Sequence, residues 1–119
     1  MAHASNRAQR RIIVRMQVSP QQQRAIDDLC RRYRVRSLRM FGSAAVGLET
    51  PASDVDLLVD FTPGQAPGAF ELVDLRDALS RVFDGRPVDL AFPGILDNPY
   101  RRQAIESQLR PLFPAAAGA

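Results

Sequence analysis

The strongest chemical signal in the sequence is a Gly-Ser pair separated by ten residues from an Asp-x-Asp motif. The pair is Gly42 and Ser43, and the aspartates are Asp54 and Asp56. On an extended strand, side chains at positions i and i+2 lie on one face, roughly 6–7 Å apart. Two carboxylates placed in this way can converge on a hard cation such as Mg²⁺, which prefers oxygen ligands.

The Gly-Ser pair suits the binding of a phosphate at a turn. Gly42 has no side chain, so a phosphate could approach the backbone closely there. Ser43 offers a hydroxyl and a backbone N–H to phosphate oxygens, at a turn where amide dipoles can point at an anion. We therefore assign Gly42 and Ser43 as candidate nucleotide-binding residues.

A third aspartate, Asp89, lies in a later apolar segment that could form a strand beside the one holding Asp54. Adjacent strands are about 4.8 Å apart, so its carboxylate could complete the cluster. Three close carboxylates repel one another unless a cation is bound. Two metal ions about 3.5–4 Å apart could then clamp the attacking and leaving oxygens of a phosphoryl displacement. Asp54, Asp56 and Asp89 are therefore the candidate catalytic and metal-ligating residues.

An Asp-x-Asp motif alone is more often a solvated strand edge, and only the full set of residues favours a site. Asp60 shares the face of Asp56 but stands at the strand end, so we interpret it as solvated.

The elements that must position these residues alternate between helical and strand periodicity. Ser19 and Pro20 are typical of a helix start, and Gly85 is typical of the residue after a helix end. The expected elements are a helix over 19–33, a strand over 35–41, a strand over 54–61, a helix over 69–83, a strand over 88–92 and a helix over about 99–109, with a loop over 44–53. This order predicts an α/β (α+β) domain with a small mixed β-sheet of about three strands flanked by helices.

The length of 119 residues suits a single domain. We predict a poorly ordered Arg-rich segment over 1–18, the folded domain over 19–113 and a disordered tail over 114–119. The single cysteine, Cys30, excludes an intramolecular disulfide and is expected to be a buried apolar residue. No apolar stretch approaches the roughly 18 residues of a membrane span, and we expect a cytoplasmic protein without membrane contact.

The charge is distributed unevenly along the chain. Residues 1–39 hold ten arginines against two aspartates, whereas residues 40–119 hold six arginines against eleven acidic residues. The basic part could be a nucleic-acid-binding arm, a surface that docks an acidic partner or polyphosphate, or simply a solvated face. Because the basic part, with Tyr33 as its one aromatic residue, offers no motif of interleaved aromatic and basic residues, nucleic acid is not expected as the primary partner.

Two segments resemble the minimal nucleotidyltransferases of the DNA polymerase β superfamily. They are Met40–Gly47 (MFGSAAVG) and Ser53–Val59 (SDVDLLV), and Pro87–Leu90 fits the family's third catalytic strand. The stretch 98–113 resembles the family's closing helix, so the likeness spans about residues 20–113. The resemblance implies a polymerase β-like nucleotidyltransferase fold.

The same resemblance assigns roles to the candidate residues. It implies that Asp54 and Asp56 hold Mg²⁺, as two ions, and that Ser43 contacts the triphosphate of ATP. Asp89 would be a metal ligand and a base toward the acceptor hydroxyl. Members of the family transfer a nucleoside monophosphate, often AMP, and release pyrophosphate.

The resemblance also implies a partner. Many minimal members are antitoxins encoded beside a HEPN-type ribonuclease toxin, and some adenylylate a tyrosine of that toxin. Larger members carry an additional helical domain for which this chain has no room. We therefore expect a second subunit, in a homo-oligomer, or a partner protein to complete the acceptor site.

One departure from the family pattern leaves two functions open. Where the family usually has Gly-Ser-Arg-Ala-Arg-Gly, this chain has Ala44 and Val46 in place of the arginines. An arginine near a transferring triphosphate stabilises developing charge. The chain is therefore either an active transferase or a binding-only antitoxin that neutralises its partner by complex formation. Arg39 or Arg36 could compensate for the missing arginines, or both could be surface charges.

Overall fold

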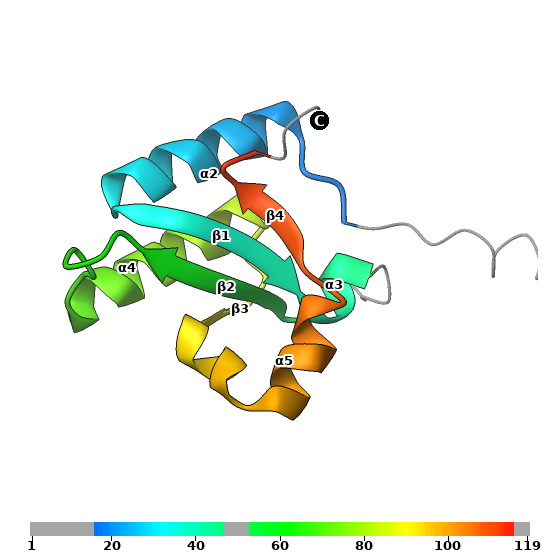
Figure 1. Ribbon diagram of the computed structural model, residues 1–119. Coiled ribbons are helices and arrows are strands. Elements are labelled where there is room, and N and C mark those ends of the chain that lie inside the picture. Colours follow the sequence, from blue (N-terminus) through cyan, green and yellow to red (C-terminus); the bar gives the residue numbers. More distant parts are fainter. Residues whose placement is uncertain (1–15, 47–52, 116–119) are drawn as a thin grey trace, which may run out of the picture.

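The computed structural model describes residues 16–46 and 53–115, without the side chains of Ser43 and Val46 (Figure 1). The elements are α2 (Pro20–Arg32), β1 (Val35–Phe41), α3 (Gly42–Val46), β2 (Val55–Phe61), α4 (Ala69–Val82), β3 (Val88–Ala91), the 3-10 helix η1 (Pro93–Asp97), α5 (Pro99–Glu106) and β4 (Arg110–Phe113). The predicted α/β class is confirmed. Three short elements were not predicted, namely α3, η1 and β4.

The four strands form one mixed sheet in the order β3-β2-β1-β4. β1 runs antiparallel to both β2 and β4, and β2 runs parallel to β3. The expected sheet of about three strands gains β4 at the edge, next to β1. Pro111 lies inside β4, and an edge strand tolerates proline because one side of its backbone needs no ladder hydrogen bonds.

The main core lies between the sheet and the two longer helices, α2 and α4 (Figure 1). Alternate residues of β2 enter this core, and Val55, Leu57 and Val59 are fully buried, as the alternating pattern predicts. Leu58 points to the other face and is fully buried as well. Short η1 contacts β2, and α5 packs against η1 on the near side of the sheet in Figure 1. Both faces of β2 are therefore partly covered.

The predicted start of the first helix is confirmed by a reciprocal cap. The Ser19 hydroxyl accepts from the Gln22 N–H at 3.0 Å, and the Gln22 side chain accepts from the Ser19 N–H at 2.9 Å. Gln22 Nε2 also donates to the Val82 carbonyl at 2.9 Å, and Gln23 Nε2 donates to the Leu112 carbonyl at 2.8 Å. These bonds tie α2 to the end of α4 and to β4.

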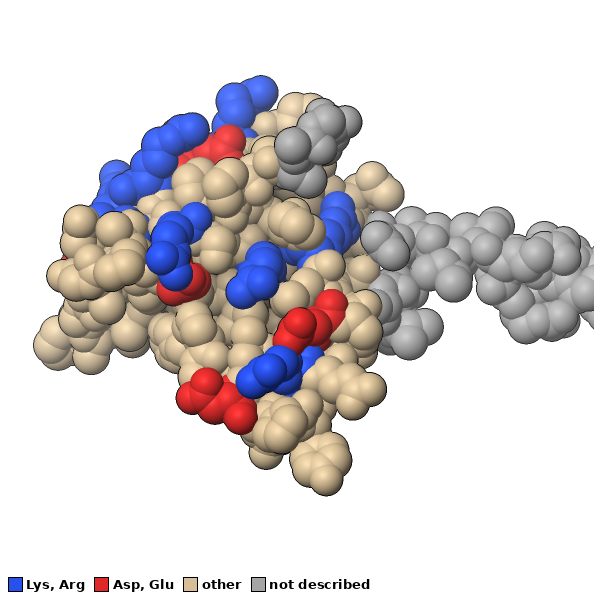
Figure 2. Space-filling view, viewed as in Figure 1, with Lys and Arg blue, Asp and Glu red and all other residues tan. Residues whose placement is uncertain are grey.

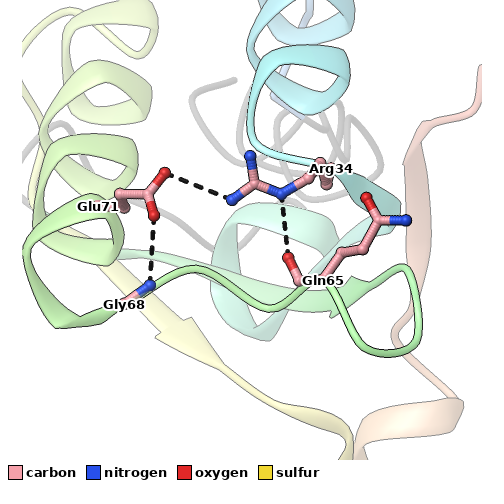
Figure 3. Close-up of polar contacts among 4 residues, drawn as sticks. All are labelled: Arg34, Gln65, Gly68 and Glu71. Atoms are coloured by element: carbon pink, nitrogen blue, oxygen red, sulfur yellow. Dashed lines mark hydrogen bonds and ion pairs between the residues drawn. The ribbon is translucent and has the colours of Figure 1, made fainter.

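Arg34 holds the connection between α2 and β1 against the loop that precedes α4 (Figure 3). Its backbone adopts a positive φ of 62°. Its side chain donates to the Gln65 carbonyl at 3.1 Å and pairs with Glu71 at 3.4 Å, while Glu71 also accepts from the Gly68 N–H. This arginine therefore has a structural role distant from the aspartates.

Two predicted irregular segments differ from expectation where the structure describes them. Residues 44–46, expected in a loop, belong to α3 because Ala44 and Ala45 pack into the core. Met16 and Val18 pack against the core, although they lie in the segment expected to be poorly ordered. Residues 1–15, 47–52 and 116–119 lie outside the described residues. No helix in the described part of the chain is long and apolar enough to cross a bilayer.

Candidate active site

Two of the three candidate aspartates lie opposite each other on neighbouring strands. β2 and β3 pair in parallel, and their register places Asp56 beside Asp89. Side chains at paired positions of neighbouring strands project from the same face of a sheet, about 4.8 Å apart at the backbone. Asp54 directly precedes β2 and is exposed, as is Asp89, whereas Asp56 is half-buried. The strand pairing expected for Asp89 is therefore present.

The electrostatics of Asp56 show that the three carboxylates act on one another. Burial raises the pKa of Asp56, and the negative charges of Asp89 and then Asp54 raise this pKa further. Burial disfavours the charged form, and so does each neighbouring like charge. A bound cation would oppose both effects, so this arrangement is chemically suited to a cation.

Asp56 also contacts the Gly-Ser turn. A β-carbon on Gly42 would lie 2.4 Å from Asp56 Oδ2, which is closer than a β-carbon in a real protein comes to another side chain. Gly42 also adopts a φ of +75°, a conformation that favours glycine. The Asp56 carboxylate therefore lies on the side of Gly42 where a side chain would stand. β-Sheet pairing of Phe41 with Asp56 brings the two together. The role of Gly42 toward a phosphate stays a prediction.

Gln108 completes this turn, and no sequence signal pointed to it. Its Oε1 accepts from the Gly42 N–H at 3.1 Å. Gln108 follows α5, so the contact joins residues far apart in the chain. The amide at the turn is therefore satisfied within the protein. The side chain of Ser43 lies outside the described residues, and its role toward phosphate stays a prediction.

Arg86 is a second residue that sequence reasoning missed. Its Nε and Nη2 donate to the Ser53 carbonyl at 3.2 and 3.0 Å. The Val55 N–H donates to the Pro87 carbonyl at 2.8 Å. These bonds tie the beginnings of β2 and β3 together on either side of Asp54, so Arg86 helps to position the aspartates.

Ala44 and Val46 stand where the family usually has arginines, and Arg36 is one of the two arginines that could replace them. Ala44 is fully buried in the core, so its side chain does not face the aspartates from the surface. The side chain of Val46 lies outside the described residues. Arg36 pairs with Asp60 through Nε, at 3.2 Å, and through Nη2. Asp60, expected to be solvated, is thus held in an ion pair.

The carboxylate oxygens of the three aspartates are suitable ligands for Mg²⁺, but they do not form a complete metal-binding site in this structure. Among the described residues, no group of three or more His, Cys, Asp or Glu side chains is close enough to hold a metal ion. The carboxylates nevertheless supply the oxygen ligands that Mg²⁺ prefers.

Of two grooves among the described residues, the larger is not at this site. A groove of about 500 Å³ lies between α2 and α4 and is lined by none of the three aspartates. A smaller groove of about 230 Å³ runs between α4 and β3 and includes Asp89 among its lining residues. We therefore place the site by its chemistry, at the neighbouring ends of β2 and β3.

The fold and the site together define a minimal nucleotidyltransferase, and comparison with known proteins agrees. Residues 23–112 match the nucleotidyltransferase domain family. The chain belongs to this family.

Curated proteins of Methanocaldococcus jannaschii are similar to this chain in sequence, and each is named as a proposed protein adenylyltransferase. One is 36% identical over 78 residues, which cover 66% of this chain and 77% of the relative. Another is 38% identical over 78 residues, which cover 66% of this chain and 76% of the relative.

Solved structures share the fold. One, described as a proposed minimal nucleotidyltransferase, has a TM-score of 0.60 and 30% identity, covering 76% of this chain and 88% of its own. A toxin–antitoxin structure with AMP-PNP has a TM-score of 0.58 and 21% identity, covering 80% of this chain and 74% of its own. At that identity the second likeness is one of fold.

Proposed function

We propose that this protein is a Mg²⁺-dependent nucleotidyltransferase that transfers AMP from ATP to a hydroxyl of a partner protein. The observation that carries the proposal is the pairing of Asp56 with Asp89 on neighbouring strands. Burial, and after it the negative charges of Asp89 and Asp54, raise the pKa of Asp56. The names of the relatives, which propose protein adenylyltransferase activity, support AMP and a protein acceptor.

Each group would have a defined part in the reaction. Asp54, Asp56 and Asp89 would hold Mg²⁺, which neutralises phosphate charge when bound. Asp89 would accept the proton of the acceptor hydroxyl, whose oxygen forms a bond to the α-phosphorus of ATP. The bond between the α-phosphorus and its bridging oxygen to the β-phosphate breaks, and pyrophosphate leaves. Arg86 would keep Asp54 in place through Ser53.

The proposed acceptor is a tyrosine of a HEPN-type toxin, and the protein would act as its antitoxin in the cytoplasm. The fold shared with a toxin–antitoxin structure that contains AMP-PNP supports a toxin as the partner, and the HEPN type and the tyrosine are part of the proposal. A partner or second subunit would complete the acceptor site, since the described residues form only an open groove beside Asp89.

A mass measurement tests the transfer. The purified protein is mixed with ATP, Mg²⁺ and the toxin candidate encoded beside it, and the partner's intact mass is recorded. We expect the partner to gain one or more AMP groups with the wild type and none with Asp54→Asn. Asp74→Asn, an exposed change on α4, is the control and should behave as the wild type. An unmodified partner would refute the transfer, and modification by Asp54→Asn would refute the site.

A binding-only antitoxin is the second candidate, and two observations favour it. The described carboxylates do not form a metal cage, and Gln108 occupies the Gly42 amide. Under this function, Asp54→Ala would neutralise the toxin as well as the wild type does, in a growth assay with both proteins expressed. Loss of neutralisation by a variant that still co-purifies with the toxin would exclude it.

A further inference from the structure

Arg39 stands on β1 beside the candidate site and faces the same side of the sheet as Asp56. Its cross-strand partner on β2 is Leu58. Two residues further along β1, Phe41 pairs with Asp56. Residues two apart on a strand share a face, and diagonal neighbours across a strand pair are roughly 7–8 Å apart. A long arginine side chain can span that separation, so Arg39 can reach the space in front of Asp56.

The guanidinium of Arg39 has an unused donor. Its Nε is buried, and it donates to no acceptor among the described residues. Nearly all buried polar groups in native proteins have a hydrogen-bond partner, so such an exception calls for a missing acceptor. The two other arginines on the described strands do have acceptors, because Arg36 pairs with Asp60 and Arg110 donates to the Met16 carbonyl.

The missing acceptor is not supplied by the protein's own carboxylates. Asp60, on the same face, is already paired with Arg36. Asp56 lies diagonally across the strand pair from Arg39, and the buried Nε of Arg39 donates neither to it nor to any other described residue. Figure 2 shows a row of basic side chains over α2 at the upper left, whereas those over the middle of this face are separate and have acidic neighbours. An anion bound here would therefore depend on individual arginines.

We infer that Arg39 binds an anionic oxygen of the nucleotide's phosphates. This inference rests on the proposed function, because it takes a nucleoside triphosphate as the ligand. The planar guanidinium presents several N–H donors in a fixed fork that matches phosphate oxygens. The sequence alone could not distinguish Arg36 from Arg39 as a replacement for the missing family arginines, whereas their contacts in the structure differ. Arg36 serves an ion pair at the far end of the strand pair, and Arg39 serves the ligand.

Binding of ATP, ADP and AMP to the full chain tests this role, measured by calorimetry with Mg²⁺ present. Arg39→Met keeps the apolar stem over Leu58 and removes the guanidinium, and Arg36→Met is the matched control on the same strand. We expect Arg39→Met to weaken ATP binding about tenfold or more, as loss of a charge-assisted contact does. AMP binding should change far less, and Arg36→Met should bind all three nucleotides as the wild type does.

Thermal unfolding separates a ligand contact from a structural role. Without nucleotide, Arg39→Met should unfold at the wild-type temperature or above, since it removes an unsatisfied buried donor. With ATP, its gain in unfolding temperature should be smaller than that of the wild type. Arg39→Lys, which keeps the charge, should recover part of the ATP affinity.

The outcomes distinguish this inference from the function on which it rests. If the wild type binds ATP and Arg39→Met binds it equally well, Arg39 is not a phosphate ligand and the proposed function is untouched. Equal losses for ATP and AMP, or a lower unfolding temperature without nucleotide, would also overturn the inference. If the wild type binds no ATP, both ideas fail together.

Discussion

Gly42 and Asp56 occupy one space, because a β-carbon on the glycine would lie 2.4 Å from Oδ2 of the aspartate. The contact joins the turn after β1 to the second residue of β2. Any side chain at position 42 must therefore displace the carboxylate that the site depends on.

We predict that Gly42→Ala destabilises the protein more than Gly64→Ala does. Both glycines have positive φ, of 75° and 77°, but a β-carbon at Gly64 meets nothing within 4 Å. Each change costs about 1–2 kcal/mol for the backbone conformation, and only Gly42→Ala adds an overlap worth about 1–3 kcal/mol. Urea unfolding of the two variants measures the difference.

The same comparison has a built-in check. In an Asp56→Ala background, where the carboxylate is absent, Gly42→Ala should cost no more than Gly64→Ala. Equal losses for the two glycine variants in the unmodified protein would mean that the carboxylate simply moves aside.

Asp56→Asn is expected to change how stability depends on pH. In the folded protein the pKa of Asp56 lies above its ordinary value of 3.8. The folded state therefore holds this proton more tightly than the unfolded chain does. Its contribution to stability is fully present below pH 3.8 and is lost as the pH rises through the folded pKa. At neutral pH without metal, Asp56→Asn should therefore unfold at a higher temperature than the wild type.

Melting curves at several pH values in EDTA measure this effect. The advantage of Asp56→Asn should shrink as the pH falls toward that of the unfolded carboxyl. Asp74→Asn, exposed on α4, should show no such trend. If the wild type is more stable than Asp56→Asn at neutral pH, burial and neighbouring negative charge do not destabilise the ionised Asp56, and the prediction is wrong.

Magnesium should stabilise the folded protein by offsetting the same repulsion. We expect Mg²⁺ to raise the unfolding temperature of the wild type relative to EDTA, because a ligand that binds only the folded state stabilises it. Asp89→Asn should reduce this gain strongly, whereas Asp60→Asn, which removes the partner of Arg36, should keep it. Matched ionic strength with NaCl excludes general screening. Equal gains in all three proteins would place the cation elsewhere.

Cys30 should be unreactive until the protein unfolds. The residue is fully buried in the core, and burial raises the pKa of its thiol to about 12. The thiolate is the reactive form, and little of it exists below that pKa. Labelling with a thiol reagent at pH 8 should be slow in buffer and fast in concentrated urea. Rapid labelling of the native protein would show that α2 opens readily.

The sequence predicted the elements whose signals are local. The alternation in 54–61 placed Asp56 and Leu57 on opposite faces of β2, and the structure agrees. The Ser19 cap likewise lies beside the helix that it starts. Such features need only neighbouring residues, so periodicity and capping rules find them.

The contacts that were missed depend on pairing between distant segments. Gly42 signals only that a side chain is absent, and the pairing of Phe41 with Asp56 decides which group fills the space. Gln108 reaches Gly42 because β4 returns the chain to β1. β4 itself carries Pro111, which argues against a strand until its edge position is known.

The position of β4 also has a consequence for how the protein is made. β1 leaves the ribosome well before β4, yet β4, residues 110–113, is its second neighbour in the sheet. Until that segment has been synthesised, one side of β1 keeps unpaired backbone groups, and such exposed edges favour association between chains. A pause in translation before residue 110 should therefore yield a nascent chain that depends on chaperones.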